Sequence, residues 1–199
     1  MSEHYYSEHP QSDFTTETWN YSINGQQFTF TSGTGVFSKG KVDFGSALLI
    51  ETFTEPKVEG NFLDVGCGYG PIGITLAQQY PHREIIMVDV NERAVKLAEL
   101  NVKQNDLPNV FVKQSDGLSK LEQQDSFAAI VMNPPIRTGK KVVYSLFEQC
   151  KSALVPSGEL WIVMQKKQGA PSAMKYLASL FQQVDVINRK KGYFIIRAK

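Results

Sequence analysis

The sequence has few cysteines and histidines and no long apolar run. Of its 199 residues, two are cysteine and three are histidine. Two cysteines cannot build a disulfide framework, and their separation is not that of paired zinc ligands. No apolar stretch approaches the ~20 residues of a membrane-spanning helix, and the N-terminal residues lack the basic and then apolar order of a signal peptide. We therefore expect a cytoplasmic protein without a metal site or a membrane partner.

An excess of one charge sign is also missing. The formal net charge is +1, with 42% hydrophobic and 21% charged residues, which is the composition of a soluble globular protein. The length suits a single domain. Residues 1–17 are polar and lack a periodic apolar pattern, which predicts a loosely held terminus. The net charge alone neither favours nor excludes binding to nucleic acid, so this question depends on how the charged residues are distributed along the chain.

A β-hairpin is predicted near the N-terminus. Residues 19–23 and 28–30 alternate apolar and polar side chains, and Asn24-Gly25 stands between them. This dipeptide is preferred in type I′ turns, whose twist matches that of the flanking strands. The pattern therefore predicts two antiparallel strands joined by a tight turn.

From residue 61 onward, strand and helix patterns alternate, which is typical of a parallel sheet with helices on both faces. Strands are predicted at 61–64, 84–89, 109–113, 127–132 and 159–164, and helices near 71–79, 91–104, 140–154 and 171–180. The end of the chain differs from this alternation. Residues 184–187 and 193–196 are rich in apolar side chains and flank a short turn at 188–192, which predicts a second hairpin.

The sequence DVGCGYG spans residues 64–70, between a predicted strand and a predicted helix. Alternating glycines let the backbone turn sharply and let a ligand approach the peptide planes. The glycines alone also suit a dinucleotide, because residues 68–73 match G-x-G-x-x-G. Asp64 separates the two cofactor classes: its carboxylate would repel a pyrophosphate, whereas it would attract the cationic amino group and sulfonium of S-adenosylmethionine.

This segment resembles motif I of the class I methyltransferases. The resemblance implies an α/β, Rossmann-like fold with a seven-stranded sheet, parallel except for the last strand, with helices on both faces and the N-terminal hairpin as an extension. It also implies S-adenosylmethionine as cofactor. The methionine end of this cofactor would then be held by Asp64 together with Gly66, Cys67, Gly68 and Gly70.

Acidic residues end two further predicted strands. Asp89 ends one strand and precedes Val90, and Asp116 with Gly117 ends the next. Ligands of open parallel sheets bind beyond the carboxyl ends of the strands, so Asp89 can accept both hydroxyls of a ribose. The resemblance implies that Asp116 meets the adenine amino group. The alternatives are helix capping for Asp89 and a simple Asp-Gly turn at Asp116.

Asn133-Pro134-Pro135-Ile136 closes another predicted strand at the same edge of the sheet. The prolines restrict the backbone, and Pro134 lacks a donor but keeps its carbonyl. Asn133 Oδ1 and the Pro134 carbonyl can both accept hydrogen bonds from an exocyclic amino group, which orients its lone pair and stabilises developing charge. We expect residues 133–136 to be catalytic and Asn133 also to contact the cofactor. A turn without function is the alternative.

Residues 35–38 and 42–49 sharpen the resemblance. They resemble the segment that precedes motif I in the small-domain methyltransferases that act on guanine N2 of small-subunit ribosomal RNA. In that family the segment lies over the cofactor, which implies contacts from Phe37 and Ser38; the alternative for Phe37 is a core position. Many members end the Asn-Pro-Pro tetrapeptide with an aromatic residue, whereas this chain has Ile136.

A ring that stacks on the target base must then come from elsewhere, or aliphatic contact must replace it. The candidates for stacking are Phe37, Tyr144 and Tyr193. The absence of an aromatic at position 136 also argues against an adenine-N6 or protein glutamine methyltransferase, which typically carry one there.

Basic residues follow two predicted strands and occupy the C-terminal hairpin turn. If the sheet is ordered as expected, these clusters lie at the same edge as the active site and form a basic rim that suits an RNA backbone. Solvated loop charge is the alternative for any one cluster. The residues are Arg137, Lys140, Lys141, Lys166, Lys167, Arg189, Lys190 and Lys191.

The sequence therefore predicts a loose terminus (1–17), a hairpin with a cofactor-covering segment (18–60) and a methyltransferase core (61–199). The predicted enzyme methylates an exocyclic amino group of an RNA base, most specifically guanine N2 in small-subunit ribosomal RNA, either as naked RNA or in a ribosomal particle. Self-association to a homodimer is one way to position the substrate. The alternatives are N-methylation of protein glutamine, adenine N6 or a small amine, a nucleotide-dependent oxidoreductase, which Asp64 disfavours, and a non-catalytic cofactor-binding module.

Overall fold

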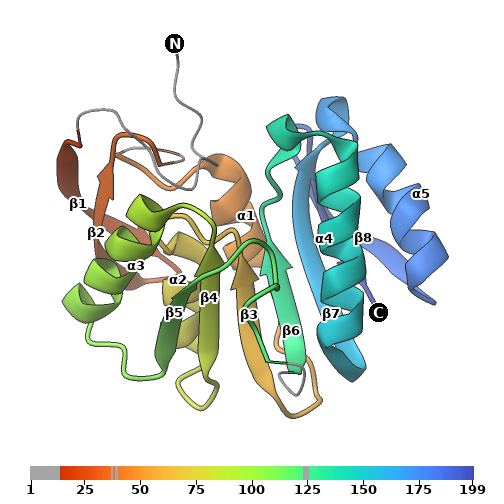
Figure 1. Cartoon of the computed structure of the whole chain (residues 1–199), viewed down its shortest axis with the longest axis horizontal. Coiled ribbons are helices and arrows are strands. Elements are labelled where there is room, and N and C mark those ends of the chain that lie inside the picture. The colour runs from red at the N-terminus through yellow and green to blue at the C-terminus, as the bar shows by residue number, and fades with distance from the viewer. Residues whose placement is uncertain (1–13, 37, 39, 123–125) are drawn as a thin grey trace.

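The structure is a computed structural model that describes residues 14–199 except 37, 39 and 123–125. It contains a two-stranded antiparallel hairpin, β1 (Thr16–Ile23) and β2 (Gln26–Gly33), and a seven-stranded sheet. Figure 1 shows the hairpin beside α3 at one side of the molecule and α5 at the other. Most of the predicted loose terminus, residues 1–13, lies outside the described residues, whereas Thr16 already pairs with Gly33 in the hairpin.

After the hairpin, strands and helices alternate up to the C-terminal hairpin, except that β6 follows β5 with no helix between them among the described residues. The strands of the large sheet are β3 (Asn61–Val65), β4 (Ile85–Asp89), β5 (Val110–Gln114), β6 (Phe127–Met132), β7 (Leu154–Gln165), β8 (Val184–Lys190) and β9 (Tyr193–Ala198). The helices are α1 (Phe44–Thr52), α2 (Pro71–Gln79), α3 (Glu92–Gln104), α4 (Lys140–Ala153) and α5 (Ala170–Leu180), with short 3₁₀ helices η1 (Ile136–Thr138) and η2 (Lys166–Gln168).

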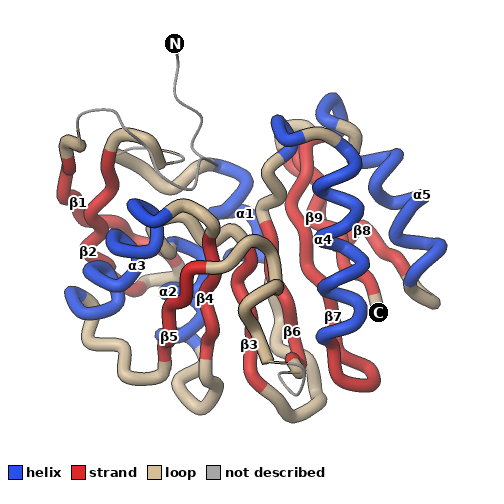
Figure 2. Tube along the Cα trace, in the orientation of Figure 1, coloured by secondary structure: helices blue, strands red, loops and turns tan. Residues whose placement is uncertain are grey.

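The strand order of the large sheet is β5-β4-β3-β6-β7-β9-β8 (Figure 2). β3 pairs in parallel with β4 and β6, and β7 continues the parallel run beside β6. Only β9, the last strand, runs antiparallel to its neighbours β7 and β8. The predicted fold class is therefore confirmed, including the reversed last strand.

Two apolar cores lie on opposite faces of this sheet. Phe62 belongs to the core that packs against α1, α2 and α3, whereas its neighbour Leu63 belongs to the core beneath α4 and α5. All six residues of β6 are buried, because a central parallel strand is covered on both faces. Helices thus cover both sides of the sheet, and the carboxyl ends of β3, β4 and β6 meet at one edge.

The N-terminal hairpin joins the first core through two asparagines, Asn101 of α3 and Asn105, which is the C-cap of that helix. Asn101 Oδ1 accepts the N–H of Thr31 at 2.7 Å, and its Nδ2 donates to the Thr31 carbonyl at 2.9 Å. One helical turn later, Asn105 repeats this pattern with the N–H and carbonyl of Thr29, at 3.0 and 2.8 Å. Side-chain amides at i and i+4 therefore pair with alternate residues along the outer edge of β2, as a neighbouring strand would.

Both predicted hairpins are present, and each turns through two residues with positive φ. Asn24 and Gly25 have φ of 50° and 77°, which is the type I′ conformation that this dipeptide favours. The C-terminal turn is shorter than the predicted 188–192, because β8 continues to Lys190. Lys191 and Gly192 make the turn, with φ of 48° and 79°.

The sequence pattern did not predict α1. Leu48, Leu49 and Ile50 are consecutive and all buried, so the helix lacks the one-sided apolar periodicity that marks most surface helices. It begins after Asp43, whose carboxylate accepts the N–H groups of Gly45 and Ser46 at 2.9 and 3.2 Å as an N-cap. β7 also begins earlier than predicted, at Leu154, beside a register shift in its pairing with β6.

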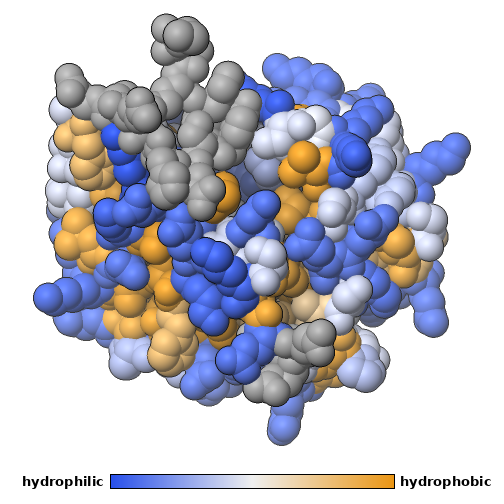
Figure 3. All heavy atoms as spheres, in the orientation of Figure 1, coloured by the Kyte–Doolittle hydropathy of each residue, from blue (hydrophilic) through white to orange (hydrophobic). Residues whose placement is uncertain are grey.

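On the face shown in Figure 3, groups of apolar side chains lie between hydrophilic ones. Phe111 on β5 and Leu100 on α3 are two of the exposed large apolar side chains. Among the helices of the described ranges, none combines the length and apolar character needed to cross a membrane.

Candidate active site

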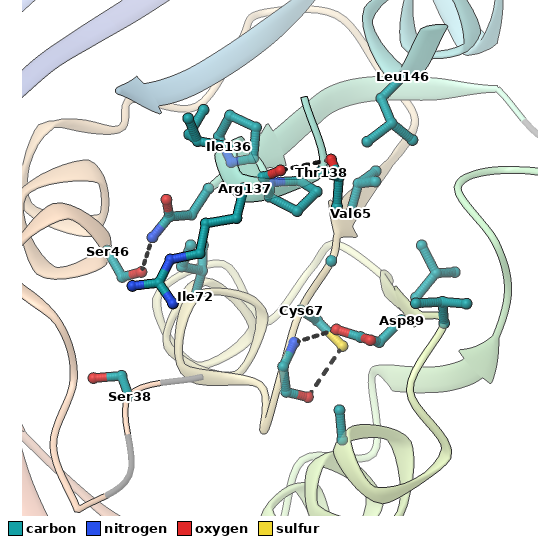
Figure 4. A pocket seen from close by; sticks show the side chains of 18 of the residues that line it. Ser38, Ser46, Val65, Cys67, Ile72, Asp89, Ile136, Arg137, Thr138 and Leu146 are labelled. Carbon is teal, nitrogen blue, oxygen red and sulfur yellow. Dashed lines mark hydrogen bonds between the residues drawn. The ribbon is translucent and has the colours of Figure 1, made fainter. Parts of the chain in front are cut away.

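A cavity of about 620 Å³ opens at the carboxyl ends of the parallel strands. Its wall combines the glycine turn after β3, the ends of β4 and β5, the Asn-Pro-Pro segment after β6, and the start of α1. Gln165 at the end of β7 and Tyr193 at the start of β9 complete it. Figure 4 shows how these side chains converge from separate elements, with Arg137 extending across the view toward Ser46.

Gly66 and Gly68 form the part of this wall where the backbone itself faces the cavity. Their φ angles are 71° and 59°, a conformation that L side chains rarely adopt. A Cβ at either position would meet no heavy atom within 4 Å. The turn therefore needs glycine for its conformation, and it leaves open space in which a ligand can approach the peptide planes.

Gly70 and Gly73 serve the packing of α2 and do not line the cavity. A Cβ on Gly70 would lie 2.9 Å from Cδ1 of Ile74, and one on Gly73 would lie 2.3 Å from Sδ of Met87. Close approach of helix and strand thus requires both glycines. Of the predicted cofactor residues of the turn, Gly66, Cys67 and Gly68 line the cavity and Gly70 lies behind it.

Asp64 is buried beneath the start of α2 and is not part of the cavity wall. Its Oδ2 accepts the Gly73 N–H at 2.9 Å, while its Oδ1 is buried and has no partner among the described residues. Burial raises its pKa to about 7, although the Gly73 N–H acts in the opposite direction, and the charge of Asp89 raises it further. A cation in the neighbouring cavity would favour the ionised form of this carboxyl group.

Asp89 lies at the cavity wall beside Val90 and organises the glycine turn. Its Oδ2 accepts the Gly68 N–H at 2.8 Å and its Oδ1 accepts the Asn91 N–H at 2.9 Å. Burial raises the pKa of Asp89, against the effect of these backbone donors. Each oxygen keeps a further lone pair, so two adjacent hydroxyl groups can still donate to it. The N-cap of α3 is Asn91, whose side chain accepts from Arg93 and Ala94.

Asp116 and Gly117 also border the cavity. Asp116 is exposed, and its carbonyl accepts the Ser119 N–H at 3.2 Å in a turn. Gly117 has φ of 55°, and a Cβ there would lie 2.6 Å from Oε1 of Gln149. The pair thus forms a tight turn at the wall of the cavity, and contact of Asp116 with the adenine amino group stays a prediction.

Asn133 enters the cavity from the end of β6, with its amide group turned in a defined direction. Its Nδ2 donates to Oγ of Ser46 at 3.0 Å and lies 3.4 Å from Oδ2 of Asp43. Its Oδ1 has no hydrogen-bond partner among the described residues and is left as an acceptor. Figure 4 draws the bond to Ser46.

The backbone after Asn133 forms two consecutive tight turns. The Pro134 carbonyl accepts the Ile136 N–H at 2.8 Å, and the Pro135 carbonyl accepts both the N–H and the Oγ1 of Thr138, at 3.0 and 2.7 Å. Pro134 therefore keeps one lone pair for another donor. Pro134, Pro135 and Ile136 all line the cavity.

The three candidates for stacking on a base are separated by the structure. Tyr193 lines the cavity, and its ring lies 5.4 Å from that of Phe44, centroid to centroid. Tyr144 lies away from the cavity wall and stacks on Tyr176, with ring centroids 4.0 Å apart. Phe37 falls outside the described residues. Of the two candidates that the structure describes, Tyr193 borders the cavity and Tyr144 does not.

Ser38 and Cys67 line the cavity, and their contact with the cofactor stays a prediction. The Ser38 hydroxyl donates to the Lys41 carbonyl at 2.8 Å, which fixes the segment before α1. Burial raises the pKa of the Cys67 thiol well above its usual value. A thiol in this state is a poor nucleophile, so we assign Cys67 no part in covalent chemistry.

The predicted basic clusters lie at the same edge of the sheet as the cavity. Gln165 pairs with Tyr193, and the Lys166 N–H donates to the Gly192 carbonyl at 2.8 Å. These contacts bring the end of β7 beside the β8–β9 turn. In the part of the chain that the structure describes, no ion pair involves the eight residues, which are Arg137, Lys140, Lys141, Lys166, Lys167, Arg189, Lys190 and Lys191.

Comparison with known proteins identifies the family. A model of the methyltransferase small domain matches residues 27–197. The chain belongs to this methyltransferase family. It is 57% identical over 199 residues to uncharacterized protein YbxB of Bacillus subtilis (strain 168), with 100% of this chain and 99% of that protein covered. It is 36% identical over 197 residues to ribosomal RNA small subunit methyltransferase C of Vibrio vulnificus (strain CMCP6), with 93% of this chain and 54% of that protein covered.

The family relationship extends to solved structures. A T. thermophilus 16S rRNA N2 G1207 methyltransferase in complex with AdoMet and guanosine matches with a TM-score of 0.83 and 26% identity, over 96% of this chain and 52% of that one. A Geobacter metallireducens precorrin-6y C5,15-methyltransferase matches with a TM-score of 0.65 at 14% identity, over 85% of this chain and 93% of that one, which is a likeness of fold alone. This member of the family spans about half the length of its ribosomal RNA methyltransferase relatives.

Sequence reasoning missed several residues of this wall, above all Asp43 and Ser46. A signal for Asp43 was present, since an aspartate directly before an apolar run marks a helix start. The contact of both residues with Asn133 had no local signal, because it joins segments 87 and 90 residues apart. Gln165 and Gln168 reach the cavity because β7 and η2 end beside it.

Proposed function

We propose that this protein is an S-adenosylmethionine-dependent methyltransferase that modifies an exocyclic amino nitrogen of an RNA base, most specifically guanine N2 in small-subunit ribosomal RNA. The observation that carries the proposal is the open Oδ1 of Asn133. It lies in the same cavity as the glycine turn, and its amide is held by Asp43 and Ser46. Methyltransferase family membership supports the class of reaction.

The residues around the glycine turn fit this cofactor. Gly66 and Gly68 leave space where a Cβ would stand, and Asp89 keeps lone pairs for two hydroxyls of a ribose. Asp64 adds negative charge behind the turn, with a buried oxygen that lacks a partner in the described structure. When bound, S-adenosylmethionine supplies an electrophilic methyl group.

The chain's own contribution to the reaction is the positioning of the acceptor nitrogen. Asn133 Oδ1 and the remaining lone pair of the Pro134 carbonyl accept the two N–H bonds of an amino group. Two acceptors hold the nitrogen in one orientation and stabilise the positive charge that develops on it. No strong general base is needed for this step, because a proton can leave after the methyl group has transferred.

An RNA substrate is supported by the basic rim and by the relatives. Arg137 lines the cavity, and the other seven cationic residues belong to segments at the same edge of the sheet. None of the eight forms an ion pair among the described residues, which suits contacts to phosphates. The base must be single-stranded or flipped, because a paired amino group cannot enter a pocket. The T. thermophilus relative was solved with AdoMet and guanosine, and the Vibrio vulnificus relative carries the name of a small-subunit ribosomal RNA methyltransferase.

The test is transfer of labelled methyl groups from S-adenosylmethionine to ribosomal RNA and to ribosomal particles from cells that lack this protein. The product nucleoside is identified by mass. We expect labelled N2-methylguanosine, and much slower labelling with the Asn133→Ala variant. Comparison of RNA with particles identifies the natural form of the substrate.

Other outcomes would change the proposal in defined ways. Label on adenine N6, on protein glutamine or on a small amine would keep the chemistry of Asn133 and discard the guanine substrate. Tight cofactor binding without any transfer would favour a non-catalytic module.

A further inference from the structure

The amide of Asn133 can occupy its site in two orientations that differ by a half-turn. In one, Oδ1 faces the cavity and accepts hydrogen bonds; in the other, Nδ2 faces the cavity and donates them. Only the first can hold the two N–H bonds of an amino group. The proposed function therefore depends on whatever selects between the two orientations.

Two side chains from the start of α1 contact the amide on the side away from the open acceptor. Ser46 Oγ accepts from Nδ2 at 3.0 Å, and Oδ2 and Oδ1 of Asp43 lie 3.4 and 3.5 Å from the same nitrogen. A hydroxyl can donate as well as accept, so Ser46 tolerates both amide orientations. An ionised carboxylate only accepts, and it repels a carbonyl oxygen placed beside it. Asp43 is thus the group that discriminates.

Asp43 is itself held in place by the helix that it caps. Its Oδ1 accepts the N–H groups of Gly45 and Ser46 at 2.9 and 3.2 Å. The helix in turn is fixed by Leu48 and Leu49, which are 2% and 0% exposed. Oδ1 is therefore committed to the cap, and Oδ2 is the oxygen that faces Asn133 most closely.

We propose that Asp43 is a positioning residue that sets the amide orientation of Asn133, so that Oδ1 faces the acceptor nitrogen. The inference deepens the proposed function and rests on it for its catalytic consequence. Asp43 acts through Asn133 and has no contact of its own with the methyl acceptor. A helix cap thereby connects the fold of α1 to the chemistry at the end of β6.

Asp43→Asn is the sharpest test, because asparagine is as good an N-cap as aspartate. The cap commits Oδ1 of the new side chain to Gly45 and Ser46, which leaves its Nδ2 where the carboxylate Oδ2 stood. A donor at that position attracts Oδ1 of Asn133 and turns the amide around. We expect kcat to fall at least about tenfold, while the KM for cofactor and the midpoint of urea unfolding stay at wild-type values.

Two variants serve as matched comparisons. Asp106→Asn removes the same charge from an exposed loop after α3 that is not part of the cavity wall, and should leave kcat unchanged. Ser46→Ala deletes the shorter hydrogen bond but keeps the carboxylate, so kcat should fall by only about two- to threefold. A larger loss in Ser46→Ala than in Asp43→Asn would overturn the assignment of the discriminating role to Asp43.

A double-mutant cycle separates positioning from a direct role. If Asp43 acts only through Asn133, Asp43→Asn has no further effect on kcat in the Asn133→Ala background. A further loss of tenfold or more in that background would mean that Asp43 touches the substrate itself, which contradicts the proposal. Wild-type kcat in the single Asp43→Asn variant would contradict it as well.

The orientation can also be measured without any methyl acceptor. In protein labelled with ¹⁵N-asparagine, the side-chain NH₂ signal of Asn133 is the one that Asn133→Ala removes. We expect contacts from these protons to Ser46 in the wild type and their loss in Asp43→Asn. If the wild-type protein shows these contacts but transfers no methyl group to RNA, the proposed function fails while the role of Asp43 in orienting the amide stands. If the contacts are absent in the wild-type protein, the role of Asp43 itself is overturned.

Discussion

The junction between the hairpin and α3 uses asparagine side chains in a different way from the cavity. At the junction, Asn101 accepts from Thr31 and donates to the carbonyls of Thr31 and Tyr69, the latter at 2.8 Å. Asn105 likewise uses its acceptor and donates to the carbonyls of Thr29 and Asn101. In the cavity, Asn133 has only its donor side satisfied within the described structure.

The same contrast holds for charged groups. The cavity region contains a buried Asp64 Oδ1 without a described partner and a rim of cations without ion pairs in the described structure. A buried polar group that lacks a partner costs free energy of folding, and the hairpin also carries such groups, Trp19 Nε1 and Gln26 Oε1, among the described residues. The comparison therefore depends on the asparagines: those of the junction use both their donors and their acceptors for stability, whereas Asn133 keeps its acceptor open towards the cavity.

The largest effect should follow from removing the open acceptor. Asn133→Ala should lower the rate of methyl transfer by about 10²–10³-fold, in the range found for loss of a single group that stabilises transition-state charge. Cofactor affinity and the urea unfolding midpoint should change little. Single-turnover transfer measures the rate, and titration measures the affinity for the cofactor. Turnover of Asn133→Ala at the wild-type rate would show that the open acceptor in the cavity has no role in the reaction.

Removing an asparagine from the junction should act on stability first. Asn101→Ala leaves the N–H and carbonyl of Thr31 and the carbonyl of Tyr69 without their partner, and should lower the free energy of unfolding by about 3 kcal/mol. Urea unfolding measures this loss. Asn105→Ala, at a half-buried position, is the milder control and should cost about 1–2 kcal/mol. A stable Asn101→Ala protein would show that the hairpin docks by apolar contacts alone.

Asp64 should make the cavity region sensitive to pH. Its folded-state pKa of about 7 lies above the ordinary value of 3.8, so its contribution to stability is fully present below pH about 4 and is lost as the pH rises through 7. Asp64→Asn removes the ionisation and should raise the free energy of unfolding by about 2 kcal/mol at pH 8, since each pKa unit corresponds to ~1.4 kcal/mol and the new amide leaves a buried donor unpaired.

Urea unfolding of the wild type and of Asp64→Asn between pH 4 and pH 8 tests this expectation. At pH 4 the carboxyl group is largely protonated in the folded state and costs little, whereas the amide still leaves a buried donor unpaired, so Asp64→Asn should be the less stable protein there by about 2 kcal/mol. Cofactor affinity at pH 8 should fall in the variant, because the negative charge behind the glycine turn is lost. Equal pH dependence in the two proteins would contradict the raised pKa of Asp64.

The smallest of these effects concerns the basic rim. Neutralising Lys166 and Lys191 together, as Lys166→Gln with Lys191→Gln, should weaken RNA binding about tenfold and reduce its dependence on salt concentration. Lys103→Gln with Lys113→Gln, on α3 and β5, removes the same charge away from the cavity wall and serves as the control. Binding of RNA at several salt concentrations measures both, and equal losses in the two double variants would argue against a rim specific to the cavity.

Local signals in the sequence were sufficient for most of the fold. The Asn24-Gly25 turn, the alternation of strand and helix after residue 61 and the glycine turn at 64–70 depend on neighbouring residues only. The sequence did not predict α1, because its consecutive apolar residues Leu48, Leu49 and Ile50 do not show the spacing of three or four residues that marks a one-sided apolar helix. Among candidate site residues, those on turns directly after strands were found, since parallel strands end at a common edge.

The sequence by itself determined the strand-turn-helix order, the family motifs and the residue types that can hold an amino group and a cationic cofactor. Only the tertiary structure decided that Asp64 lies behind the cavity wall, that Tyr193 and not Tyr144 borders it, and that Asp43 faces Asn133. These placements depend on packing between segments far apart in the chain, and no local propensity encodes which way a side chain turns once two such segments meet.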